Sequence, residues 1–192
     1  MVETRNASQT RAKIAAAAVQ VFAERGYEGA TTRQIAAAAG VNQGLITYYF
    51  QSKERLWKEA VSGMFGEARA MLEEAEAAAE GHTRTAGNRA RIHAMVRFFA
   101  ERPHIARLMI QEGKQASDRM RWLVDHWLSG LYASISFLSE DPERRAHEFY
   151  ALTGAATLIF AVPDECERLT GCSPRTDAAI RAHADLIADL FA

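Results

Sequence analysis

The chain has 192 residues, of which 48% are hydrophobic and 24% charged, and its formal net charge is −1. This ordinary globular composition excludes a disordered chain and leaves room for one large domain or two small ones with buried cores. Alanine is abundant and proline is scarce at four residues, so helix is favoured almost throughout. We therefore predict an all-α fold.

The small net charge hides an asymmetry between two parts of the chain. Residues 1–53 carry six basic and three acidic side chains, whereas residues 54–192 carry 17 basic and 21 acidic ones. A basic first part on an acidic remainder indicates that only the first part meets a polyanion such as nucleic acid.

The two cysteines, Cys166 and Cys172, lack the paired spacing of a zinc site and are too few for a disulfide framework. We expect free thiols in a reducing compartment, with no metal and no cofactor. No apolar run approaches the ~20 residues that cross a bilayer, and the polar N-terminus lacks the apolar segment of a signal peptide. A cytoplasmic protein is expected.

Hydrophobic periodicity predicts four helices in the first part of the chain. They run from Ser8 or Thr10 to Arg25, from Thr31 or Thr32 to Ala39, from Gln43 to Phe50, and from Ser52 toward Ala79. The boundary residues are caps at Thr31 or Thr32, Asn42 and Ser52, and stops at Gly26 and Gly40. The third segment contains LITYYF, which favours a strand by propensity, but the caps around it favour a short helix.

Five further helices are predicted from the same signals. They cover residues 87–101, Pro103 to Glu112, Ser117 to about Leu138, Asp141 and Pro142 to about Ala161, and a last segment through Ile180 to the C-terminus. Residues 80–87 are expected to interrupt the pattern. A loop is expected where Pro163, Gly171 and Pro174 occur.

Two short helices joined by a glycine turn have the layout of a helix-turn-helix, whose second helix enters the major groove of DNA. Eight residues at 1.5 Å rise span about 12 Å, which suits a groove of about that width. Ile46 and Phe50 are expected to pack on Ile35 and Phe22. The other face of the second helix is then left to meet DNA.

Polar groups on that outer face match what DNA recognition needs. A glutamine can hydrogen-bond a base edge, and threonine and tyrosine hydroxyls can reach bases or phosphates. Gln43, Thr47 and Tyr48 point outward on this reading, with Gly44 allowing close approach. Basic residues at the starts of the neighbouring helices are expected to sit on the flanking phosphates.

The stretch TRAKIAAAAVQVFAERGYEGATTRQIAAAAGVNQGLITYYFQSKERL closely resembles the N-terminal domain of TetR/AcrR-family transcriptional regulators. The resemblance covers about residues 10–56 and rests on VFAERGYEGATTRQIA, the AGV turn and GLITYYFQSKERL. It implies DNA contacts from Thr32, Arg33, Gln43, Gly44, Thr47, Tyr48, Tyr49 and Lys53. The family commonly has tyrosine at the position of Thr47, so we expect the phosphate contact there to be shortened, lost or replaced by Tyr48.

The resemblance also implies a helix-turn-helix domain over residues 1–53 and a helical domain over residues 54–192 that dimerises and holds a small-molecule pocket. We assign the homodimer interface to the last two predicted helices, where Gly154, Ala155 and Ala156 allow close approach. Large residues at helical spacing are the candidates for contact with a small hydrophobic effector. They are Met95, Phe98, Phe99, Met109, Trp122, His126, Trp127, Phe149 and Tyr150, with Phe160 as a further member of the aromatic set.

The leading expectation is a repressor that binds a palindromic operator as a dimer and is released by an effector. Two alternatives remain within the same class: a transcriptional activator, or a redox-responsive regulator acting through Cys166 and Cys172. A helical enzyme or carrier is the least favoured reading, because no catalytic motif accompanies the six scattered histidines. We predict that the protein is not an enzyme.

Overall fold

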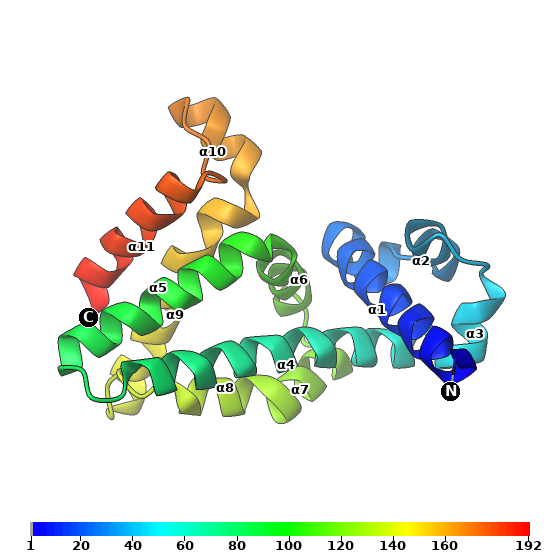
Figure 1. Cartoon of the computed structure of the whole chain (residues 1–192), viewed down its shortest axis with the longest axis horizontal. Helices are drawn as coiled ribbons and strands as arrows, with labels where there is room; N and C mark the ends of the chain where they lie inside the picture. The colour runs from blue at the N-terminus through cyan, green and yellow to red at the C-terminus, as the bar shows by residue number, and fades with distance from the viewer. Residues whose placement is uncertain (1) are drawn as a thin grey trace. The chain divides into compact units, whose positions relative to one another are not determined.

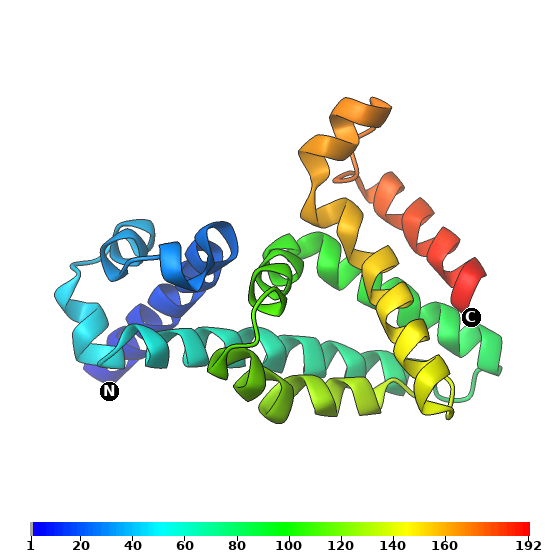
Figure 2. The ribbon, with the colours of Figure 1, turned by 180° about the vertical axis from the view of Figure 1, so that it is seen from behind.

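Every regular element that the computed structural model describes is a helix (Figures 1 and 2). The description covers the backbone of residues 2–192 and the side chains of residues 7–192. The predicted all-α fold is confirmed for this part of the chain. None of its helices is both long and apolar enough to cross a membrane.

The chain divides into two compact units, each built from two separate stretches of sequence. The first, which we call the head unit, runs to Gly66 and also includes Arg107–Trp122. The second, the body unit, comprises Glu67–Ala106 and Leu123–Ala192. Both units are therefore discontinuous in sequence.

The head unit contains the predicted helix-turn-helix. Its elements are α1 (Val2–Gly29), α2 (Thr32–Ala39), α3 (Gly44–Phe50), the first part of α4 (Lys53–Ala79), the end of α6 (Pro103–Gly113) and α7 (Asp118–Leu123) up to Trp122. The apolar positions that the periodicity singled out are buried, among them Ile14, Phe22, Ile35, Ile46 and Phe50. LITYYF is helical, so its strand propensity is overridden.

Gly26 interrupts α1, as the sequence predicts. Its φ of 67° and ψ of 169° are not helical, and φ in this range favours glycine. A further short turn carries the element on to Gly29, and the Ala30 N–H donates to the Gly26 carbonyl at 3.2 Å.

The body unit is a second packed cluster of helices. Besides the rest of α4 and α6, its elements are α5 (Arg84–Glu101), η1 (Val124–Leu128), α8 (Ser129–Ser134), α9 (Pro142–Ala161), α10 (Pro163–Thr170) and α11 (Asp177–Phe191). Its core brings together α5, α9 and α11 through residues such as Ile92, Val96, Leu152, Phe160 and Ile187.

Two predicted helix boundaries in this part of the chain are wrong. Helix α5 begins at Arg84 rather than near residue 87, because Thr83 caps it by accepting a hydrogen bond from the Ala86 N–H. The helix capped by Ser117 ends at Ser134 rather than Leu138, and its middle, η1, is a π-helix.

The early end of that helix has a physical cause in Arg145. Its guanidinium donates to the carbonyls of Tyr132 at 2.7 Å and Ile135 at 3.0 Å. Carbonyls at a helix C-terminus need donors from outside the helix, and here α9 supplies them. Such a distant donor leaves no local signal in the sequence.

The loop predicted around Pro163, Gly171 and Pro174 is also partly wrong. Its first half is helix α10, with Pro163 at its first position and two acidic residues in its first turn. Gly171 ends it in the left-handed conformation, at φ 72°. Proline at the start and glycine at the end are ordinary helix boundaries, so local signals for this helix were present.

Candidate nucleic-acid interface

The turn between α2 and α3 is fixed at both ends by backbone and capping hydrogen bonds. Thr31 and Gln34 form a reciprocal capping box: the Gln34 N–H donates to Thr31 Oγ1 at 3.2 Å, and the Thr31 N–H donates to Gln34 Oε1 at 2.9 Å. At the other end Gly40 adopts φ 60° and ψ 42°, and its N–H donates to the Ala37 carbonyl at 3.1 Å. The predicted cap and stop of this helix are both confirmed.

Asn42 and Gly44 together start α3. The Gly44 N–H donates to Asn42 Oδ1 at 2.8 Å, so Asn42 caps the helix although the first helical residue is Gly44 rather than Gln43. A Cβ added at Gly44 would lie 3.3 Å from the same oxygen, which is a tight contact. Glycine at position 44 therefore leaves room for the Asn42 cap. It also leaves the start of α3 without a side chain on its outer face.

The two faces of α3 separate as the sequence predicts. Ile46 and Phe50 are buried, whereas Gln43, Gly44, Thr47 and Tyr48 are exposed. Tyr48 is 76% exposed, and its ring meets that of half-buried Tyr49 edge-on at 5.0 Å. The helix thus presents hydroxyl and amide groups to solvent on a rigid apolar base, which is the chemistry of a DNA-reading helix.

The glutamine at the start of α3 is held by the preceding helix. Gln43 Nε2 donates to Thr32 Oγ1 at 3.1 Å, across the turn. Both residues were predicted to lie at the interface, but no local pattern in the sequence indicates a hydrogen bond between them. It joins the first residue of α2 to the residue that precedes α3.

The cations beside α3 are available to phosphate. Arg33 is exposed and has no ion pair among the described side chains. Lys53, at the start of α4, places Nζ 4.3 Å from the centroid of the Tyr27 ring, and no carboxylate pairs with it in the described part of the chain. Because no described carboxylate pairs with Arg33 or Lys53, the charge of each is available to an anion.

Gln51 ends α3 in an uncommon backbone conformation. Its φ of 66° makes it the one non-glycine residue with positive φ in the described chain, and its N–H donates to the Thr47 carbonyl at 3.0 Å. Its side chain accepts a hydrogen bond from Arg55. Ser52 then caps α4 by accepting from the Arg55 N–H at 3.1 Å, as predicted.

Behind the helix-turn-helix, the head unit contains an aromatic and ionic cluster that sequence analysis missed. The Arg119 guanidinium lies 3.8 Å from the centroid of the Tyr27 ring and pairs with Glu112 at 3.2 Å. Trp57 is fully buried and meets the rings of Tyr27 at 6.3 Å and Trp122 at 5.8 Å. Burial raises the pKa of Tyr27 above its ordinary value of 10.0. The segment after α6 is thereby an integral part of the head unit.

The nine candidate effector contacts are divided between the two units. Met109 and Trp122 belong to the head unit, and the other seven belong to the body unit. Met95 and Phe160 are in the core of the body unit, and Phe99 and Phe149 pack against this core. Phe98 is buried, His126 and Tyr150 are exposed, and Trp127 lies in the π-helix η1.

Two grooves of about 420 and 230 Å³ in the body unit contain none of these nine residues. Both grooves are lined by Arg84, Asn88 and Phe137. Their walls are mainly polar, so they do not match the apolar pocket expected from the sequence.

The outer faces of α9 and α11 leave apolar side chains uncovered. Leu158, Leu186 and Leu190 are 56%, 56% and 67% exposed. A Cβ at Gly154 would meet nothing within 4 Å, so this part of α9 is open. Exposed apolar groups beside an open helix face are typical of surfaces that another chain covers.

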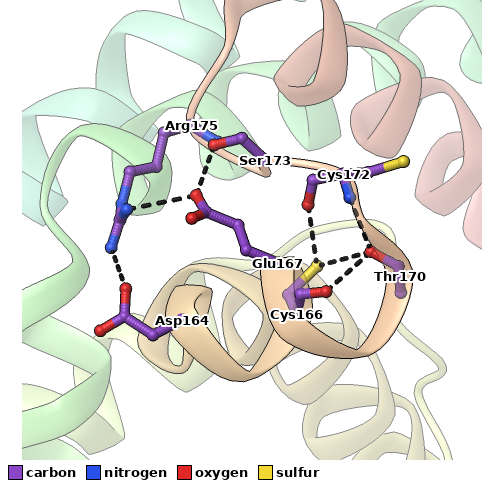
Figure 3. A network of polar contacts seen from close by, with 7 residues as sticks. All are labelled: Asp164, Cys166, Glu167, Thr170, Cys172, Ser173 and Arg175. Atoms are coloured by element: carbon purple, nitrogen blue, oxygen red, sulfur yellow. Dashed lines mark hydrogen bonds and ion pairs between the residues drawn. The ribbon is translucent and has the colours of Figure 1, made fainter.

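The two cysteines are free thiols in and after α10 (Figure 3). Cys166 Sγ lies 3.8 Å from both Thr170 Oγ1 and the Cys172 carbonyl oxygen, while the Cys172 sulfur points away from Cys166. Beside them, Arg175 pairs with Asp164 at 2.7 Å and with Glu167 at 3.2 Å. In the described residues, no group of histidine, cysteine and acidic side chains is arranged to hold a metal ion.

Residues 14–60, which hold α2, α3 and most of the outer face described above, match the family model "Bacterial regulatory proteins, tetR family". The HTH-type transcriptional repressor NicS of Pseudomonas putida is 39% identical over 74 residues. This alignment covers 37% of the present chain and 35% of NicS, so the chain spans about a third of the length of this relative.

Two solved structures share the fold over almost the whole chain. A putative TetR-family transcriptional regulator from Mesorhizobium loti superposes with a TM-score of 0.62 at 20% identity, over 96% of both chains. FadR from Bacillus subtilis, solved in complex with stearoyl-CoA, superposes with a TM-score of 0.65 at 20% identity, over 93% of this chain and 96% of FadR. At this identity the likeness establishes the fold alone.

The fold and the outward polar face of α3 define a helix-turn-helix protein with a helical second unit. More particularly, residues 14–60 match the tetR-family model of bacterial regulatory proteins, and the chain as a whole shares its fold with solved structures of transcriptional regulators, one of them described as TetR-family.

Proposed function

We propose that the protein is a ligand-responsive transcriptional repressor that binds a palindromic DNA operator as a homodimer. The observation that carries this proposal is α3, whose apolar residues are buried and whose polar residues face solvent within a TetR-family domain. NicS, to which this domain is similar, is a repressor by name, which favours repression over activation. In this proposal the protein acts in the cytoplasm, as a regulator and not as an enzyme.

The proposed DNA contacts are of two kinds. Gln43 reads a base edge, with Gly44 allowing close approach, while the hydroxyls and cations around α3 position the duplex through its phosphates. The positioning groups are Thr32, Arg33, Thr47, Tyr48, Tyr49 and Lys53. Thr47 is the shortest of the α3 hydroxyl side chains, and Tyr48 extends beyond it at the exposed surface.

We assign DNA binding to residues 1–53 and effector binding and dimerisation to residues 54–192. The exposed apolar faces of α9 and α11 support a dimer through these two helices, although α10 intervenes between them in sequence. A two-fold dimer presents two copies of α3 to two half-sites of a palindrome. An effector then releases DNA only if it binds the dimer more tightly when the spacing of its two head units does not fit the operator than when it does.

The effector in this proposal is a small hydrophobic molecule contacted by the nine aromatic, methionine and histidine side chains named above. FadR of B. subtilis was solved with stearoyl-CoA, so long-chain acyl compounds are the first class to screen. Operator affinity should fall when the correct compound is added. Unchanged affinity across a broad panel of apolar compounds would leave constitutive DNA binding instead.

The DNA-binding assignment is tested by the double variant Tyr48→Ala, Lys53→Ala. We expect binding to duplexes selected from a genomic library to be abolished, while the circular dichroism spectrum and dimer mass stay unchanged. Arg97→Ala is the matched control, because Arg97 is an exposed cation on α5. Full operator affinity in the double variant would refute the site.

A further inference from the structure

We propose that Thr32 is a positioning residue that holds the Gln43 amide in the orientation that reads adenine in the major groove. This inference rests on the proposed DNA-binding function and deepens it, because it names a base and the group that selects it. The observation behind it is the 3.1 Å hydrogen bond from Gln43 Nε2 to Thr32 Oγ1.

Both ends of this bond are attached to anchored backbone. Thr32 is the first residue of α2, whose start is fixed by the capping box of Thr31 and Gln34. Gln43 directly precedes α3, whose start is fixed by the bond from the Gly44 N–H to Asn42 Oδ1 at 2.8 Å. A long exposed side chain that would otherwise sample several rotamers is thereby held at its tip, which lowers the entropy lost when it meets a base.

The donors and acceptors that remain free on Gln43 select the base. A glutamine amide has two N–H donors and one carbonyl oxygen, and Thr32 takes one of the donors. One N–H and Oε1 remain, and adenine offers the matching pair, an N7 acceptor and an N6–H donor. Guanine presents two acceptors at the same edge, so it would place O6 against Gln43 Oε1.

The two other glutamines in this part of the head unit are occupied within the protein. Gln34 Oε1 accepts from the Thr31 N–H at 2.9 Å and from the Thr31 hydroxyl at 3.0 Å. Gln51 Oε1 accepts from Arg55. Gln43 Oε1, by contrast, receives no hydrogen bond from any described group, so it is the amide oxygen left for a base.

Thr32 keeps a function of its own in this arrangement. Its oxygen accepts from Gln43, and its hydroxyl hydrogen remains free to donate to a phosphate. Two effects of Thr32 on DNA binding are therefore separable. Loss of the phosphate contact weakens binding equally on all sequences, whereas loss of the amide orientation weakens discrimination at one base pair only.

The test measures affinities for the selected operator and for its three substitutions at each position. The base pair read by Gln43 is the one whose preference disappears in Gln43→Ala, and we expect that pair to carry adenine. At this pair Thr32→Val, which removes the hydroxyl at constant shape, should reduce the preference for adenine roughly five- to tenfold. Thr32→Ser, which keeps the hydroxyl, should retain the preference for adenine.

The double variant Thr32→Val, Gln43→Ala should show no loss of preference beyond that of Gln43→Ala alone. The inference is overturned if Thr32→Val weakens all four sequences equally, or if the pair identified by Gln43→Ala prefers another base. A wild-type protein that selects no duplex at all would refute the proposed function itself, which is a different result. Unchanged thermal unfolding of Thr32→Val and Gln43→Ala confirms that both variants are folded.

Discussion

The surface around α3 in the head unit differs from the body unit in how its basic side chains are paired. On the outer face of the head unit, Arg33 and Lys53 have no ion pair among the described side chains. In the body unit many arginines are bound to carboxylates or carbonyls of the same unit, namely Arg89, Arg91, Arg102, Arg144, Arg145 and Arg175. A cation that is already paired gains little from a phosphate, so this contrast supports the proposed DNA-binding face.

The head unit also contains the one charged side chain that the described chain fully buries. Glu112 is 5% exposed and pairs with Arg119, which also reaches Glu28 at 3.4 Å. The body ion pairs have at least one well-exposed partner, as in Arg91 with Glu76. The head unit therefore contains a buried ion pair as well as cations with no ion-pair partner among the described side chains.

The largest effect we expect comes from breaking the buried pair. Arg119→Met leaves Glu112 without its partner and also removes the cation from the Tyr27 ring. Loss of one partner of a fully buried pair costs about 3–5 kcal/mol, and partial exposure of Arg119 reduces this to about 2–3 kcal/mol. This loss of unfolding free energy can be measured by urea unfolding, with tryptophan fluorescence as the signal.

Arg121→Met is the matched control for this prediction. Arg121 is on the same helix and pairs with Asp118, but both side chains are exposed. Its loss should change the unfolding free energy by less than about 0.5 kcal/mol. Equal costs for the two variants would show that the cluster around Tyr27 does not stabilise the head unit more than a surface ion pair does.

An intermediate effect is expected in the salt dependence of DNA binding. Each phosphate contact releases counterions, so the slope of log K against log salt falls by about 0.9 per contact. Arg33→Ala and Lys53→Ala should each make the slope less negative by about 0.9. Arg97→Ala in the body unit should leave it unchanged. A slope near zero for the wild type would contradict phosphate contacts by the head unit.

The smallest effect concerns acid stability of the body unit. The hydrogen bond from Arg91 lowers the pKa of Glu76 below its ordinary value of 4.5. Because the pKa is lower in the folded protein than in the unfolded chain, the pair stabilises above about pH 4.5, and this stabilisation is lost as the pH falls through the folded value. Glu76 is half exposed, so the gain is below about 1 kcal/mol.

Urea unfolding at pH 7 and pH 3 measures this loss in the wild type and in Glu76→Gln. Between pH 7 and pH 3 the unfolding free energy of the wild type should fall by more than that of Glu76→Gln. Glu74→Gln, on the same helix, is the control and should behave as the wild type. A wild-type loss no larger than that of Glu76→Gln would count against the pair.

Local sequence signals were sufficient for the helix-turn-helix. Thr31, Gly40, Asn42 and Ser52 act on neighbours within three residues, and the structure places their caps and turn as predicted. Burial of Ile46 and Phe50 follows from their spacing on α3. Such short-range chemistry can be read from sequence because both partners are close together in it.

Contacts between distant residues were not predictable in the same way. The Arg145 bonds that end α8, and the stacking of Arg119 on Tyr27, join residues that carry no shared local pattern. Helix α10 is different, since Pro163 and Gly171 marked its boundaries and only their interpretation was wrong. The assignments of DNA contacts, effector contacts and domain boundaries remain predictions.

The place of residues 107–122 in the head unit has a consequence for how the protein is made. Trp57 and Tyr27 leave the ribosome early, but Arg119 and Trp122, which pack against them, follow only after some sixty further residues. The head unit therefore stays incomplete while the first part of the body unit is being synthesised. A fragment cut after Gly66 would keep α3 yet expose the aromatic surface behind it, so the head unit is not a module that can be separated by a single cut.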